Sequence, residues 1–205
     1  MVVARPPATD YDLPPALVSQ VWLDPHPDLC YRMRIVDFWN GHRRKASAVA
    51  DWCSDLGFDV ERTIETGCLR GAECGYIAAA ACARLLHLEG LWCNGDVAAY
   101  CRSEDRIAEG NYVLGEAHNG TESRFLNGGE VRSIFYNYVG IRPSGALEPL
   151  QAAFDELITV ISADVERSVS TGIGQAPRLI VSNYGASSGP GSHWFVVMYE
   201  ITTKE

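Results

Sequence analysis

The sequence predicts an α+β fold in one domain. Helical patterns fill most of the chain, and two strongly β segments, 178–184 and 193–201, lie at its end. With 205 residues, 47% of them apolar, the chain is long enough for one well-buried core and too short for two ordinary domains. We therefore expect helices first and a sheet last, with the two β segments paired as an antiparallel hairpin.

The first 30 residues predict an extended arm because prolines recur through them. We expect this arm, 1–30, to lie over the body of the protein, held there by the apolar residues Val21, Trp22 and Leu23. Residues 31–205 are then expected to form the single folded, catalytic domain.

The segment 33–56 predicts a helix, since its apolar residues recur at helical spacing and Gly57 follows as a stop. The alternating segment 58–64 predicts a short strand. A further helix is expected to begin at 94–96 and to end before Gly110, followed by a loop over 110–128.

Two more helices are predicted in the second half of the chain. Asn127 and Glu130 stand three residues apart before an apolar run, the spacing of a capping box at a helix start. The segment 147–168 carries apolar residues on one face and predicts a longer amphipathic helix.

The stretch 71–86, GAECGYIAAAACARLL, joins a polar entry to an apolar helix. A helix that is apolar on nearly every face has to be buried. Cys74 in its first turn would meet unpaired backbone N–H groups and the positive end of the helix dipole, which favour a thiolate. Cys74 is therefore the candidate nucleophile, Cys68 is the alternative, and Cys82 is expected to be a packing residue.

A nucleophilic cysteine needs a histidine as base and a third group to orient the imidazole. Of the five histidines, His193 has the most rigid mount, because it begins a strongly β strand. We expect Asn183, on the partner strand, to reach the imidazole. Glu200, which faces the opposite way on an alternating strand, and an acid from elsewhere in the chain remain open. The Cys74 backbone N–H is the expected oxyanion donor, with an unidentified side chain.

The motif Gly71-Ala72-Glu73-Cys74-Gly75-Tyr76 resembles the Gly-x-Asp-Cys-Gly-aromatic motif of SUMO-specific (Ulp-type) proteases. It is also similar to the Cys-Gly-Tyr entry of UFM-specific proteases and to the cysteine helix of OTU deubiquitinases. His193-Trp194 before an apolar strand resembles the histidine strand of the Ulp and OTU types. These families share a papain-like core and cleave after the C-termini of ubiquitin-like proteins.

No single one of these families matches every position. The cysteine precedes the histidine, an order that fits papain, OTU and UFM-type enzymes or a permuted Ulp-type core. Gly71 stands where OTU enzymes have an aspartate, Cys68 where Ulp-type enzymes have the oxyanion glutamine, and Gly191 where UFM-type enzymes have an aspartate.

The resemblance implies a papain-like cysteine protease, an isopeptidase or deubiquitinase that cleaves after the C-terminus of ubiquitin or a ubiquitin-like modifier. Such an enzyme forms a thioester on Cys74, with His193 as base, and uses no cofactor. Gly75, Gly189 and Gly191 are candidates to line a groove narrow enough for the modifier's tail. Two alternatives stay open: acyl transfer to an amine, and a non-catalytic interaction domain in which Cys74 only packs.

The net charge and the cysteine content indicate which partners and which cellular compartment suit this chain. The net charge of −9 argues against nucleic acid or anionic membranes as the main partner and suits a basic protein surface. Seven cysteines without a regular framework favour a reducing compartment. Neither a spanning segment nor a signal pattern is present, so we expect a cytoplasmic protein, with a nuclear location left open. The cysteines lack a Cys-x-x-Cys pair, so no metal is expected.

Overall fold

The computed structural model describes residues 24–37, 43–64, 72–87, 104–115, 124–139, 150–183 and 193–205. The proposed arm over 1–30 lies mostly outside these ranges, although its last residues already belong to the first strand. The elements, in chain order, are β1 (Leu29–Asp37), α2 (Arg43–Asp55), β2 (Phe58–Ile64), α3 (Cys74–His87), α5 (Glu104–Val113), α6 (Gly128–Val139), β3 (Leu150–Ala153), α7 (Phe154–Thr171), β4 (Gln175–Asn183) and β5 (Trp194–Thr203).

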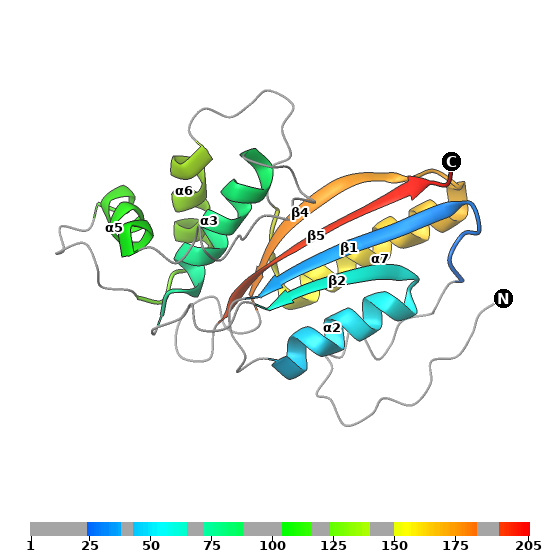
Figure 1. The fold of residues 1–205 in the computed structure, drawn as a ribbon, viewed down its shortest axis with the longest axis horizontal. Coiled ribbons are helices and arrows are strands. Elements are labelled where there is room, and N and C mark those ends of the chain that lie inside the picture. The colour runs from blue at the N-terminus through cyan, green and yellow to red at the C-terminus, as the bar shows by residue number, and fades with distance from the viewer. Residues whose placement is uncertain are drawn as a thin grey trace.

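The strands form one mixed sheet in the order β2-β1-β5-β4-β3 (Figure 1). Strand β5 lies at the centre and runs antiparallel to β1 and β4, whereas the two outer pairs are parallel. The predicted antiparallel pairing of the two C-terminal segments is confirmed, and so is the α+β class. The expectation of helices first and a sheet last is wrong, because β1 and β2 precede most of the helices.

Helices α2 and α7 cover the same face of the sheet. Each connects two parallel strands, α2 from β1 to β2 and α7 from β3 to β4. Strands β1 and β3 run in the same direction. In the strand order of the sheet, β2 lies on the same side of β1 as β4 lies of β3. Because such crossovers are right-handed, both helices are placed on one face. Side chains that alternate along β1 then meet α2 and α7 in one buried cluster that includes Met33, Trp52 and Leu157.

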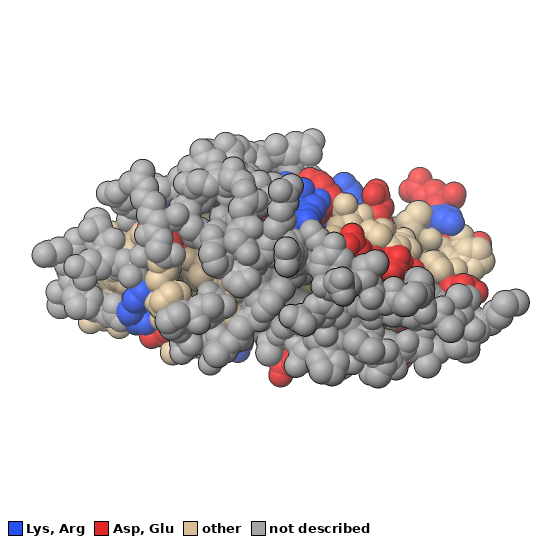
Figure 2. Space-filling view, turned by 90° about the horizontal axis from the view of Figure 1, so that it is seen from below, with Lys and Arg blue, Asp and Glu red and all other residues tan. Residues whose placement is uncertain are grey.

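On the opposite face, the described helices α3, α5 and α6 gather at one end of the sheet (Figure 1). There α3 is buried among α6 and the apolar residues of β4 and β5, so the prediction of a buried cysteine-bearing helix packed on the C-terminal strands is confirmed. Further along this face, Arg32 stands between Asp59 and Glu200 on neighbouring strands. Opposite charges across the strands suit a sheet surface in contact with water. Figure 2 shows acidic and basic side chains mixed over the described part of the lower side.

The predicted helix over 33–56 is wrong in its first part. Residues Leu29–Asp37 form β1 and only Arg43–Asp55 form α2. The side chains of Leu29, Tyr31, Met33 and Ile35 alternate toward one core, which is the period of a strand. The predicted stop at Gly57 is confirmed: its φ is 94°, a conformation that favours glycine, and β2 begins at the next residue as predicted.

Gly110 does not end a helix. Helix α5 runs through it to Val113, and Gly115, with φ of 72°, follows the helix. A Cβ at Gly110 would lie 2.5 Å from the Tyr76 ring, so this glycine lets α5 approach α3 closely. The predicted loop over 110–128 is therefore wrong at its first residues and at Gly128, which begins α6, and the proposed start at 94–96 lies outside the described residues.

The capping box is confirmed at the start of α6. The Asn127 backbone N–H donates to Glu130 Oε2 at 2.8 Å, and the Glu130 backbone N–H donates to Asn127 Oδ1 at 3.0 Å. The predicted helix over 147–168 is shifted: residues 150–153 form β3 beside β4, and α7 extends from Phe154 to Thr171. The pairing of β3 with β4 supplies hydrogen bonds that the local helical pattern does not reveal.

Candidate active site

Three side chains that are far apart in the sequence meet at one end of the sheet. Asp37 is the last residue of β1, His193 directly precedes β5, and Cys74 is the first residue of α3. Because β1 and β5 are antiparallel neighbours, the end of one lies beside the start of the other. Helix α3 packs on the same region of β5 (Figure 1), which brings the cysteine to the histidine.

The pair of His193 and Asp37 is short and enclosed. Nε2 of His193 lies 2.6 Å from Oδ1 of Asp37, and each side chain is only 1% exposed. Burial of ionisable groups is unfavourable unless they are paired, so the two side chains stabilise each other. The contact also fixes the orientation of the imidazole ring.

The Cys74 side chain lies close enough to the His193 ring to be one of the groups that raise the pKa of the imidazole. Since Nε2 faces Asp37, the other ring nitrogen, Nδ1, is the one left for the thiol. Cys74 is 5% exposed. The structure thus brings together Cys74 and His193, the two residues that the sequence pairs as nucleophile and base.

The protonated form of His193 is strongly favoured. Burial alone would lower the pKa of the imidazole, but hydrogen bonds to Asp37 and Cys74, and the negative charges of these groups, raise the pKa of His193 to about 9. An imidazolium next to a cysteine stabilises the thiolate, the nucleophilic form. At neutral pH the His193 ring is therefore an imidazolium, held beside Cys74.

Asn183 contacts the backbone of His193. Its Oδ1 accepts a hydrogen bond from the His193 backbone N–H at 3.3 Å, and it is buried. This contact fixes the start of β5, while the group that meets the ring at Nε2 is Asp37. Glu200 lies seven residues further along β5, about 23 Å away at ~3.3 Å per residue, and is too far from the ring.

Asp37, the acid in contact with the His193 ring, is not among the residues named from the sequence, but it fits the open alternative of an acid from elsewhere in the chain. It lies 156 residues from His193, within a segment predicted to be helical. The alternation of apolar residues from Leu29 to Ile35 was the available signal, because it indicates a strand that ends at this aspartate.

Of the other residues that the sequence analysis names, Gly75 and Cys82 are described in the structure. Cys68, Gly189 and Gly191 lie outside the described residues. Gly75 is buried, and a Cβ there would lie 3.1 Å from Leu126 and 3.2 Å from Val131, so it makes room for the core. Cys82 is fully buried in α3, as expected of a packing residue.

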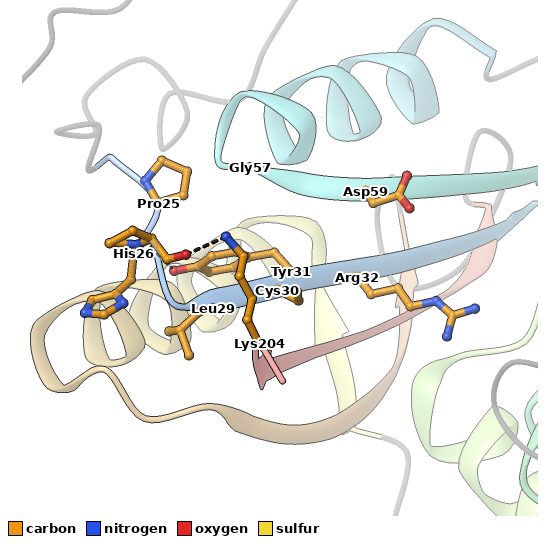
Figure 3. A pocket seen from close by; sticks show the side chains of 10 residues that line it. Pro25, His26, Leu29, Cys30, Tyr31, Arg32, Gly57, Asp59 and Lys204 are labelled. Carbon is orange, nitrogen blue, oxygen red and sulfur yellow. Dashed lines mark hydrogen bonds between the residues drawn. The ribbon is translucent and has the colours of Figure 1, made fainter.

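A pocket of about 500 Å³ lies at the other end of the sheet. Figure 3 shows it around the start of β1, with Lys204 donating a hydrogen bond to the Pro27 carbonyl. Leu29 pairs with Thr203 there, whereas Val36 pairs with Val196 near the cysteine. The pocket is therefore remote from Cys74.

The described ranges hold neither a metal-binding cluster nor a membrane-spanning helix. Among these residues, no three His, Cys, Asp or Glu side chains are arranged to hold a metal ion. Within the same ranges, no helix is both long and apolar enough to cross a bilayer.

Comparison with known proteins gives no relative: no family model, curated protein or solved structure matches this chain. The chemistry of the Cys74, His193 and Asp37 cluster must therefore be argued from its geometry.

The raised pKa of His193 predicts that stability depends on pH. In the unfolded chain the histidine titrates near 6.5, and in the folded protein near 9. The stabilisation is therefore complete below pH 6.5 and is lost as the pH rises through 9. It amounts to roughly 3 kcal/mol. Urea denaturation at intervals from pH 6 to 10 measures it, and a His193→Gln variant should lose this part of the pH dependence. A wild-type curve that is flat between pH 6.5 and 9 would contradict the ion pair.

Proposed function

We propose that this protein is a cysteine hydrolase with a papain-like arrangement, in which Cys74 is the nucleophile, His193 the base and Asp37 the orienting acid. The observation that carries the proposal is the buried contact of these three side chains, drawn from the ends of three different elements. A thiol, an imidazole and a carboxylate in series are the parts of a nucleophilic triad. The packing of α3 on the sheet beside a histidine-bearing strand supports the papain-like arrangement.

The residues divide the reaction between them. The Cys74 thiolate attacks the acyl carbon of the substrate, and the Cys74 backbone N–H at the start of α3 stabilises the oxyanion. The His193 imidazolium gives its Nδ1 proton to the leaving amine, and a thioester remains on Cys74. Water, deprotonated by His193, then attacks the thioester; the acid product leaves, and the thiolate–imidazolium pair is restored. Asp37 holds Nε2–H throughout and stabilises the imidazolium.

For the substrate we propose the C-terminal tail of ubiquitin or a ubiquitin-like modifier, joined to an amine. The resemblance of the motifs around Cys74 and His193 to proteases of that class supports this choice. The net charge of −9 would favour a partner with a basic surface.

The deciding experiment uses ubiquitin and ubiquitin-like modifiers that carry a C-terminal electrophile. We expect one modifier to form a covalent adduct with the wild-type protein, which mass spectrometry detects as a shift of one modifier mass. Cys74→Ala should abolish the adduct because it removes the nucleophile. His193→Ala should slow its formation by at least about 100-fold, because the base contributes 10²–10⁴-fold.

Two control variants separate the site from accidental labelling. Cys30 is exposed, so Cys30→Ala tests reaction at an accessible thiol and should leave the adduct unchanged. Cys68→Ala tests the alternative nucleophile. An adduct that survives Cys74→Ala would overturn the assignment, and no adduct with any modifier would remove the proposed substrate.

The same thioester could be resolved by an amine instead of water. A single-turnover reaction with a modifier thioester, with and without added amine, distinguishes hydrolase from acyltransferase by the product formed. A native Cys74 that resists every thiol reagent, yet reacts after unfolding, would favour the non-catalytic interaction domain.

A further inference from the structure

The residue after the histidine makes a long-range contact of its own. Trp194 donates its indole Nε1–H to the backbone carbonyl of Leu126 at 2.9 Å, across 68 positions of sequence. Trp194 is 2% exposed and Leu126 1% exposed. A buried indole N–H needs an acceptor, and this one ties the start of β5 to the segment that precedes α6.

The residue after the cysteine contacts the same leucine. Gly75 packs so closely against Leu126 that an added Cβ would lie 3.1 Å from the leucine Cβ and Cδ1. Leu126 therefore contacts the neighbour of the nucleophile through its side chain and the neighbour of the base through its carbonyl.

The segment that holds Leu126 is itself fixed. Asn127 belongs to the capping box of α6, and Glu130 of that box pairs with Arg124 at 2.8 Å. Leu126 thus sits between two anchors that join it to α6. Because Leu126 is fixed in this way and contacts both elements, it can hold the start of α3 in a fixed position relative to the start of β5.

We propose that Trp194 is a positioning residue, which acts through Leu126 to set the start of α3, and with it Cys74, against His193. We call the contacts of Leu126 with Trp194 and with Gly75 the bridge. This inference rests on the proposed function, since it assigns the bridge a role in activating Cys74. Thiol and imidazole must keep hydrogen-bond geometry for the thiolate to persist, and a displacement of about 1 Å can lower a rate 10²-fold. Loss of the bridge should therefore lower the reactivity of Cys74 while the fold remains.

The test is the rate of Cys74 alkylation by iodoacetamide, measured from pH 5 to 10 by mass spectrometry. Trp194→Phe keeps an aromatic ring and removes the N–H donor, and we expect its rate at pH 7 to fall about tenfold or more, with a pH profile moved toward that of an ordinary thiol. The matched control is Trp52→Phe: Trp52 is equally buried but lies on the other face of the sheet, so its rate and pH profile should match the wild type.

A second pair of variants tests the other half of the bridge and serves if Trp194→Phe does not fold. Leu126→Ala removes the contact with Gly75 and should also slow alkylation about tenfold. Leu157→Ala makes a similar cavity beneath α7 and should not. If Trp194→Phe and Leu126→Ala react like their controls, the bridge is wrong although the triad stands. If wild-type Cys74 reacts no faster than a free thiol at pH 7, both the proposed function and the bridge fail.

Discussion

Asp37→Asn should lower the rate of adduct formation at Cys74 by between about 10²- and 10⁴-fold without unfolding the protein. Asparagine has nearly the same shape as aspartate, so the buried site beside His193 stays filled. The charge that stabilises the imidazolium is lost, however, and the amide can turn its NH2 group toward Nε2 and favour the wrong tautomer. The contact of 2.6 Å between Oδ1 and Nε2 makes this aspartate the group on which the ring depends.

The same substitution should lower the pKa of His193 from about 9. Burial, which disfavours the imidazolium, would then be opposed only by Cys74. The alkylation rate should fall most at neutral pH, where the wild-type ring is protonated. NMR titration of the His193 ring, in parallel with the alkylation rate from pH 5 to 10, measures both effects.

Two variants make the result specific. Asp51→Asn changes an exposed aspartate on α2 and should leave rate and pKa unchanged. Asn183→Ala removes the acceptor for the His193 backbone N–H and should have a smaller effect than Asp37→Asn, because the ring keeps its partner. If Asn183→Ala proves the more damaging and Asp37→Asn is nearly neutral, Asp37 is not the third residue.

Asp164→Ala should lower the free energy of unfolding by about 3 kcal/mol. Asp164, on α7, is 2% exposed, and its Oδ2 accepts hydrogen bonds from Arg178 Nε and from the Tyr199 hydroxyl, each at 2.7 Å. Burial and the hydrogen bond to Asp164 raise the pKa of Tyr199 well above its ordinary value, so the hydroxyl remains a donor. Alanine would leave this buried donor without its acceptor.

Urea denaturation should show a lower midpoint with an unchanged slope. The loss of stability is smaller than for a fully buried ion pair, because the Arg178 side chain is 36% exposed and can turn to water. Glu166→Ala, an exposed change on the same helix, should alter stability by less than about 0.5 kcal/mol. Since Asp164 lies under the opposite face of the sheet, alkylation of Cys74 should not change. An Asp164→Ala variant as stable as Glu166→Ala would contradict this role.

The features that could be predicted from sequence are those with local causes. The capping box of Asn127 and Glu130 lies within one turn, and the glycine after α2 needs a positive φ. Helix α3 has so few polar residues that only burial suits it, and β5 is strongly β in composition. Cys74 and His193 followed from these elements, because a helix start and a strand start are rigid mounts for reactive groups.

The features that could not be predicted depend on distant partners. Gly110 lies within a helix because the Tyr76 ring fills the space where its side chain would be, which no local pattern reveals. Residues 150–153 become a strand because β4 pairs with them. Asp37 illustrates both reasons: its strand lies in a segment whose apolar spacing also fits a helix, and its partner lies 156 residues away.

The central position of β5 also determines when the candidate site can form. The units β1-α2-β2 and β3-α7-β4 are each a parallel pair with its own helix, and in the sheet only β5 lies between them. Such contacts across most of the chain are closed late, since they carry the largest loop-closure entropy. His193 arrives with the strand that joins the two halves. During synthesis, Cys74 therefore cannot meet His193 until β5 has joined the sheet.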